Sequence, residues 1–183
     1  MSLNEIGILG YLAVFAALAA LSRGRDGEGG EPPPGGSSGG PGGGFPNPGG
    51  GSLGLRSNNP GNIVKSSISW QGKIPCPGRF ECFESMFFGV RALAVNLQSY
   101  YFQRGLTTVS EIISRWAPPF ENDTGAYIRF VAGRMGVDPN RPFEWSRSNV
   151  TRLVSSIIDM ENGSRAAARV GAQTIANAVN AVL

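Results

Sequence analysis

The chain has 183 residues, of which 41% are hydrophobic, 16% are charged and none is histidine. The absence of imidazole excludes a Ser–His–Asp or Cys–His nucleophilic centre and zinc sites that need histidine, and two cysteines are too few for a four-thiolate metal site. The formal net charge of +3 is too small to indicate nucleic-acid binding, and we expect no metal ion or other cofactor. Carboxylate chemistry, membrane attachment and structural roles remain open.

Residues 1–22 are predicted to form a transmembrane anchor. The run from Ile6 to Ser22 holds 17 residues without a charge, and a helix of that length would span about 25 Å of a hydrocarbon core about 30 Å thick. A cleaved signal peptide or an interfacial helix is the alternative. A signal peptide needs a basic segment before the apolar run, but the charge there is Glu5, whereas Arg23 and Arg25 follow the run. The sequence therefore favours a retained anchor.

Residues 23–54 are predicted to be a disordered linker. They include 15 glycines and 6 prolines, and such a composition cannot bury enough apolar surface to offset the entropy of the chain. A flexible linker of this length has an end-to-end distance of roughly 30 Å. It would let a domain move beside a membrane while staying attached to it.

Residues 55–183 are predicted to fold as one mainly helical globular domain. They carry 14 basic and 9 acidic side chains, a mildly basic balance that suits an anionic partner or an ordinary solvated surface. Short β-compatible runs at 63–70 and 79–83 form a candidate hairpin. Helical periodicity then predicts helices over 85–104, 108–117, 122–135, 149–160 and 164–183, with Thr108 and Glu111 at the spacing of a capping box.

Two features of this domain have alternative interpretations. In the last predicted helix, Ala168, Ala172 and Ala176 form a stripe that would permit close approach of another helix, or the helix is simply amphipathic and packs on the domain. Cys76 and Cys82 lie six positions apart and either close a small disulfide loop or remain as reduced thiols.

Carboxylates are the candidate acids and bases, because histidine is absent. Glu121 follows an aromatic and proline-rich run at 116–120, and Glu84 follows Phe80 and Phe83. A carboxyl beside apolar rings has a raised pKa and can serve as the general acid of glycosidic cleavage, so Glu121 is the candidate catalytic acid and Glu84 its candidate partner. In the alternative interpretation, both residues only support the starts of helices.

Two further groups of residues have a binding and a structural interpretation. Four large aromatic side chains would either stack on sugar rings or fill the core; they are Trp70, Trp116, Tyr127 and Trp145. Three asparagines around Pro60 and Gly61 would either bind a polar ligand or hold a turn through hydrogen bonds to the backbone; they are Asn58, Asn59 and Asn62.

Short blocks in a fixed order give the chain a family resemblance. They are the runs at 56–63 (RSNNPGNI), 70–72 (WQG), 83–85 (FES), 89–92 (GVRA), 115–119 (RWAPP) and 121–124 (ENDT), followed by Tyr127 and Ile128. Over residues 56–137 the sequence resembles a family of virion structural proteins of tailless, membrane-containing icosahedral phages of the corticovirus type and of related prophages.

The resemblance implies a virion protein that links the internal membrane to the capsid or the host wall. It would reside in the virion membrane, and in the host cell membrane during assembly, with lipid and either capsid proteins or peptidoglycan as partners. The resemblance also implies a lysozyme-like or transglycosylase-like domain, so the alternative function is cleavage of peptidoglycan during host entry. The chain departs from the muramidase pattern, in which the catalytic glutamate ends a helix before the β-hairpin. Here only the linker and the asparagine-rich turn precede the candidate hairpin.

Overall fold

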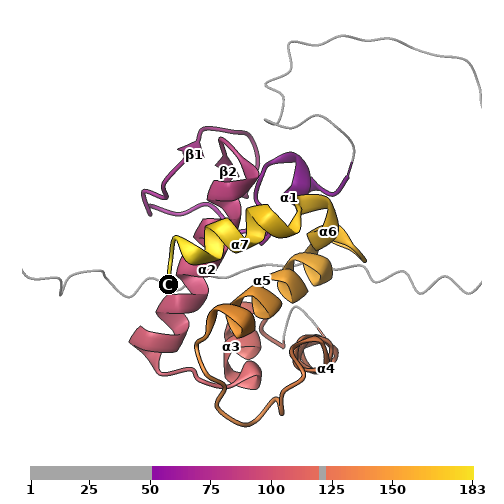
Figure 1. Ribbon diagram of the computed structural model, residues 1–183. Helices are drawn as coiled ribbons and strands as arrows, with labels where there is room; N and C mark the ends of the chain where they lie inside the picture. Colours follow the sequence, from indigo (N-terminus) through magenta and orange to yellow (C-terminus); the bar gives the residue numbers. More distant parts are fainter. Residues whose placement is uncertain (1–50, 120–122) are drawn as a thin grey trace, which may run out of the picture.

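The structure is a computed structural model, and it describes residues 51–119 and 123–183 (Figure 1). The predicted anchor at 1–22 and residues 23–50 of the predicted linker lie outside the described residues. Within the described ranges, no helix has the length and hydropathy needed to cross a membrane. The elements in chain order are α1 (Leu53–Arg56), β1 (Lys73–Ile74), β2 (Cys82–Phe83), α2 (Met86–Gln98), the π-helix η1 (Ser99–Gln103), α3 (Val109–Trp116), α4 (Thr124–Met135), α5 (Arg147–Asn162), α6 (Ala166–Val170) and α7 (Ala172–Asn180).

Helix α5 organises the core of the domain. It packs against α1, α2, α4, α6 and α7, and α7 in turn packs along α2 (Figure 1). The buried face of α5 repeats at helical spacing and consists of Val150, Leu153, Val154, Ile157 and Ile158. The prediction of a mainly helical domain is therefore confirmed for the described residues.

Local capping signals begin and end the helices where the sequence predicts. Thr108 Oγ1 accepts a hydrogen bond from the Glu111 backbone at 3.1 Å, and Glu111 Oε2 accepts one from the Thr108 backbone at 3.0 Å, so the predicted capping box is present. Asp123 caps the start of α4, which ends at Gly136 in the left-handed conformation. The predicted helix over 85–104 forms as α2 followed by the π-helical turn η1.

The C-terminal segment differs from the single predicted helix. Gly171 has a φ of +94° and separates α6 from α7, so the segment turns instead of continuing. Ala168 and Ala172 are exposed, whereas the buried face of α7 is formed by Ile175, Ala178 and Val179. The alanine stripe is therefore not the face that packs on the domain, and the amphipathic interpretation holds for α7.

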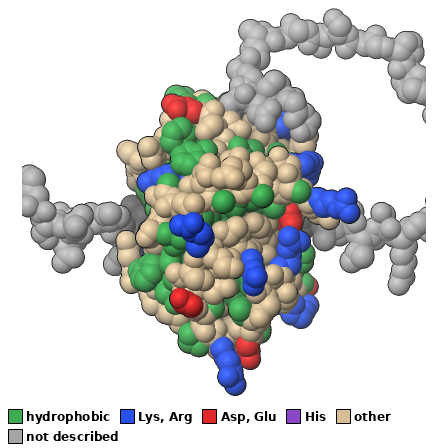
Figure 2. All heavy atoms as spheres, in the orientation of Figure 1, with side chains coloured by type: hydrophobic (Ala, Val, Ile, Leu, Met, Phe, Trp, Pro, Cys, Tyr) green, Lys and Arg blue, Asp and Glu red, His purple; other side chains and the backbone are tan. Residues whose placement is uncertain are grey.

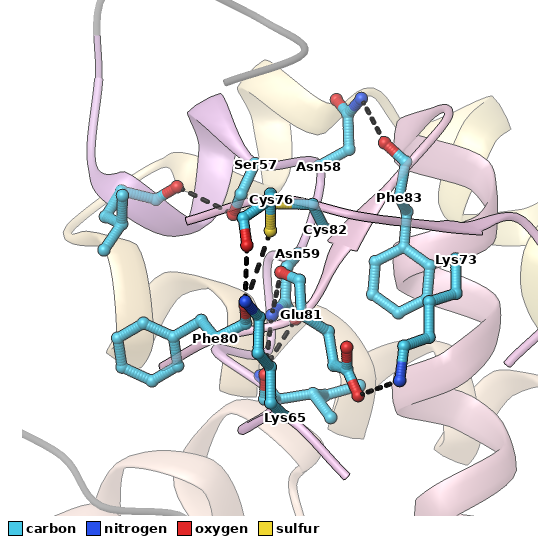
Figure 3. The surroundings of a disulfide bond; sticks show 12 residues. Ser57, Asn58, Asn59, Lys65, Lys73, Cys76, Phe80, Glu81, Cys82 and Phe83 are labelled. Atoms are coloured by element: carbon cyan, nitrogen blue, oxygen red, sulfur yellow. Dashed lines mark hydrogen bonds and ion pairs between the residues drawn. A yellow bond between two sulfur atoms is a disulfide. The ribbon is translucent and has the colours of Figure 1, made fainter. Parts of the chain in front are cut away.

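The second strand of the hairpin lies within the predicted run at 79–83, whereas the first strand forms later than the predicted run at 63–70. Strand β1 pairs antiparallel with β2, with Lys73 opposite Phe83 and Ile74 opposite Cys82. The run at 63–70 contributes one isolated bridge, between Val64 and Phe80. Cys76 and Cys82 form a disulfide that closes the hairpin loop (Figure 3).

On the face of the domain that Figure 2 shows, charged side chains lie over several elements. The Lys and Arg side chains on this face have hydrophobic and acidic side chains between them. This distribution fits an ordinary solvated surface better than one concentrated anion-binding patch.

Candidate functional site

The asparagine-rich turn holds the hairpin against the helical core. Asn59 is completely buried; its Nδ2 donates to Ile63 O at 2.9 Å and to Glu81 O at 3.0 Å, and its Oδ1 accepts from Ile63 N at 2.9 Å. Asn58 Nδ2 donates to Phe83 O at 3.0 Å (Figure 3). These side chains replace ladder hydrogen bonds that the short strands cannot supply. The structural interpretation of both asparagines is therefore confirmed.

A partly buried ion pair fixes the other side of the hairpin. Glu81 is completely buried, and its Oε1 lies 2.8 Å from Lys73 Nζ (Figure 3). The same Oε1 accepts from Ser66 N at 2.9 Å, and Lys73 also donates to Ser66 O and Ile68 O. The pair joins the 66–68 loop to β1 and to the residue before β2, and loss of Lys73 would leave the buried Glu81 carboxylate without its cation.

A second polar cluster surrounds the carboxyl of Glu161, the penultimate residue of α5. Glu161 Oε1 accepts hydrogen bonds from Tyr127 Oη at 2.7 Å and from Trp116 Nε1 at 3.2 Å. Glu161 Oε2 accepts one from Asn62 Nδ2 at 3.1 Å. Three segments of the chain therefore meet at one carboxyl, and we call these four residues the Glu161 cluster.

Local structure explains how the cluster assembles. Trp116 ends α3, Tyr127 lies in the first turn of α4, and Asn62 has a φ of +50° at the end of the asparagine-rich turn. Helix α1 passes close by at Gly54. A β-carbon at Gly54 would lie 2.5 Å from Asn62 Oδ1, so only glycine lets α1 approach the turn this closely.

The environment of Glu161 favours its protonated form. Burial raises the pKa of this carboxyl to about 8, and the hydrogen bonds from Tyr127, Trp116 and Asn62 only partly oppose that shift. Burial, followed by the nearby Glu161, raises the pKa of Tyr127 well above its usual value. The negative end of the α5 dipole also disfavours a carboxylate at this position. At neutral pH, Glu161 is therefore a neutral acid.

Of the two sequence-based catalytic candidates, the structure describes Glu84. Glu84 is exposed just after β2, and none of the hydrogen bonds among the described residues joins its side chain to the Glu161 cluster. Glu121 lies outside the described residues. No group of three or more Cys, Asp or Glu side chains in residues 51–119 and 123–183 is placed to hold a metal ion.

The aromatic candidates are mostly part of the core. Trp116 and Tyr127 are buried, with 1% and 3% of their surface exposed, so neither can stack on a sugar ring in this structure. Trp70 and Trp145 are partly buried and pack against the same core. The structural interpretation therefore holds for Trp116 and Tyr127.

Glu161 was absent from the sequence-based candidates, although a signal for it exists. It follows Ile157 by four positions and Ile158 by three, so it continues the buried stripe of α5. A carboxyl on an apolar helix face is unusual unless it is paired or functional. Helical periodicity could therefore have identified it.

The fold and the cluster define a small helical domain whose asparagine-rich turn connects a disulfide-closed hairpin to the carboxyl of Glu161. No protein-family model matches the chain. Protein P5 of Pseudoalteromonas phage PM2 is 40% identical to it over 116 residues, which cover 61% of this chain and 71% of the relative. The chain therefore belongs to the family of Protein P5. The match confirms the broader expectation of a phage structural protein.

Proposed function

We propose that this protein is a membrane-anchored component of a membrane-containing phage virion and links the internal membrane to the capsid or the host wall. Residues 1–22 are the proposed anchor. The proposed linker is the part of 23–54 that precedes Ser52, because Ser52 caps α1 and Leu53 begins this helix. The family of Protein P5 supports the virion role, and the uncharged run from Ile6 to Ser22 supports the anchor. The proposed partners are lipid and either capsid proteins or peptidoglycan, in the virion membrane and in the host membrane during assembly.

The observation that carries this proposal is the attachment of the N-terminal segment to the central helix. Ser52 Oγ donates to Asn162 Oδ1 at 2.5 Å, at the C-terminal end of α5. Asn162 Nδ2 in turn donates to Pro60 O at 2.6 Å and to Ile158 O at 3.0 Å. A pull on the preceding residues would thus act on the core helix rather than on a peripheral loop, as suits a domain that bridges two layers.

Vesicle flotation tests the anchor. The full chain is expected to float with phosphatidylethanolamine–phosphatidylglycerol vesicles, whereas a chain lacking residues 2–22 should stay in the dense fraction. Circular dichroism of both chains controls for folding. Flotation of the shortened chain would contradict the anchor and move the membrane contact to the folded domain.

Cross-linking in phage particles tests the link to the capsid or wall. A photo-reactive amino acid at Phe102, whose side chain is 62% exposed, reports on what faces the domain. Capture of a capsid protein, identified by mass spectrometry, would support the structural role. Capture of the chain's own copies alone would contradict it.

A second candidate function is cleavage of peptidoglycan, and the neutral acid at Glu161 specifically favours it. In the sequence-based form of this proposal, Glu121 is the acid and Glu84 its partner. Release of soluble glycan from peptidoglycan by the purified full chain is the test. If either residue acts as proposed, its change to Gln should lower the rate at least ~100-fold. An inactive wild-type protein would leave the structural role standing alone.

A further inference from the structure

We propose that Glu161 is the proton donor of a glycan-cleaving site in this domain, and that the transferable proton resides on Oε2. The inference rests on the second proposed function, the cleavage of peptidoglycan. It assigns the acid of that reaction to the end of α5 instead of to Glu121.

The hydrogen bonds at the carboxyl decide which oxygen carries the proton. Oε1 already accepts two hydrogen bonds, from Tyr127 and Trp116, and so uses both of its lone pairs. Oε2 accepts one, from Asn62, and retains a second lone pair. A proton on Oε2 therefore leaves all three donors satisfied.

The two carboxyls of the described domain that are less than a tenth exposed, Glu81 and Asp159, show what a purely structural acid looks like here. Asp159, also on α5, lies 2.9 Å from Arg134 Nη2 and accepts a hydrogen bond from Ala167 N at 2.7 Å. Glu81 pairs with Lys73 at 2.8 Å. Both have a cation that compensates for the cost of burying charge.

Glu161 differs from these two carboxyls. Its described partners are an amide, an indole and a phenol, and none of the ion pairs among the described residues includes it. It also lies at the negative end of its helix. A carboxyl kept neutral in this way is suited to give up a proton rather than to hold an ion pair.

The partners of the two carboxyl oxygens differ in how far they are buried. Trp116 and Tyr127, which bind Oε1, are 1% and 3% exposed and belong to the core. Glu161 and Asn62 are both partly exposed. Oε1 therefore bonds to two core side chains, whereas Oε2 bonds to a partly exposed one, so we assign the donation of the proton to the Oε2 side.

The proposed step conserves atoms and electrons. Glu161 Oε2 gives its proton to the glycosidic oxygen while the bond from the anomeric carbon to that oxygen breaks, and the bonding pair stays with the oxygen. Water supplies the oxygen that bonds to the anomeric carbon, and one of its protons returns to Glu161 Oε2. The products are two shorter glycans, one with a new reducing end and one with a new hydroxyl.

The test measures new reducing ends released from purified peptidoglycan sacculi by the full chain in mild detergent. Glu161→Gln keeps the size and neutrality of the side chain but removes the transferable proton, so the rate should fall at least ~100-fold. Glu144→Gln, the same change at an exposed carboxyl of the α4–α5 loop, is the matched control and should keep the wild-type rate.

The outcomes separate this inference from the function on which it rests. An active wild-type protein that tolerates Glu161→Gln, or that loses activity only on Glu121→Gln or Glu84→Gln, would overturn the role of Glu161 and leave the enzymatic function intact. An inactive wild-type protein would overturn both.

A second variant decides the matter if Glu161→Gln does not fold. Tyr127 is the titratable side chain that contacts Glu161 among the described residues, and Arg169 of α6 approaches the next residue, donating to Asn162 O at 3.3 Å. Tyr127→Phe removes a hydrogen bond that favours the carboxylate. The pH at which activity is lost on the alkaline side should therefore rise. If Tyr127→Phe and the wild-type protein lost activity at the same alkaline pH, that result would contradict proton donation by Glu161.

Discussion

Gly89 of α2 lies directly against the backbone carbonyl of Asn58: a β-carbon at position 89 would fall 1.7 Å from that oxygen. Asn58 is itself constrained, because it has a φ of +53° and its side chain donates to Phe83 O. Helix α2 can therefore approach the asparagine-rich turn only where it has no side chain. The glycine serves packing here, against its low helix propensity.

This contact predicts that Gly89→Ala lowers the free energy of unfolding by at least about 2 kcal/mol, because the backbone of the turn or of α2 must shift to make room. Gly133 in α4 is the matched control, since it is exposed and a β-carbon there would meet nothing within 4 Å. Gly133→Ala should stabilise the protein by about 0.5–1 kcal/mol. Urea unfolding measures both, and effects of the same sign would contradict this account.

The pKa of Glu161 predicts how stability depends on pH. The folded state holds the proton up to about pH 8, whereas an unfolded chain loses it near the ordinary value of 4.5. Between these values the folded state binds more protons, so stability is greatest on the acid side and falls as pH rises, by at most about 1.4 kcal/mol per pH unit. Urea unfolding of the full chain from pH 5 to pH 8.5 measures the slope.

Glu161→Gln is the control for the dependence of the free energy of unfolding on pH. Because an amide cannot titrate, the free energy of unfolding of this variant should fall less as pH rises, so the variant should become more stable relative to wild type. Its amide nitrogen can replace Oε2 if the Asn62 amide turns to present its oxygen. Parallel pH profiles for the two proteins would show that Glu161 does not hold a proton in the folded state.

The helices could be predicted from sequence because their signals are local. The capping box of Thr108 and Glu111 and the stop at Gly136 each depend on neighbours within one turn. The second strand lies within the run predicted at 79–83, but β1 could not be placed, because it is held by side chains outside its own two residues, such as Glu81, rather than by its own pattern. Gly171 alone gave too weak a signal to predict the break between α6 and α7.

The Glu161 cluster was harder to predict than the helices. Asn62, Trp116 and Tyr127 precede Glu161 in the sequence by 99, 45 and 34 positions, respectively. Periodicity places Glu161 on the buried face of α5, but no single-sequence pattern brings Asn62, Trp116 and Tyr127 to it. The asparagine-rich turn shows the reverse case: its residue types predicted a turn, and its role in joining the hairpin to the core required the structure.

The disulfide predicts a modest dependence of stability on redox conditions. Cys76 and Cys82 are separated by six positions, and closing so short a loop stabilises a protein by roughly 2 kcal/mol through the unfolded state. Reduction with a phosphine should lower the free energy of unfolding by about that amount. Cys76→Ser should show the same loss and no response to the reductant. Equal stability of oxidised and reduced protein, with free thiols confirmed by titration, would contradict the prediction.

A deletion in the predicted linker and a substitution at the start of the folded domain should affect the stability of the protein differently. Deleting residues 24–43 removes a segment rich in glycine and proline, which has little apolar surface to bury. The melting temperature of the full chain in detergent should therefore change by less than about 4 °C, which corresponds to roughly 1 kcal/mol for a domain of this size.

Ser52→Ala acts on the other side of that boundary. Ser52 caps α1, accepting from Leu55 N at 3.4 Å, and donates to Asn162 at the end of the central helix. Its loss leaves the partly buried Asn162 oxygen without this donor and should cost about 1 kcal/mol. Circular dichroism melting compares the two changes in the same detergent. If the deletion destabilised the protein more than Ser52→Ala, the segment before residue 44 would have to pack on the domain, and the proposed linker would be part of the fold.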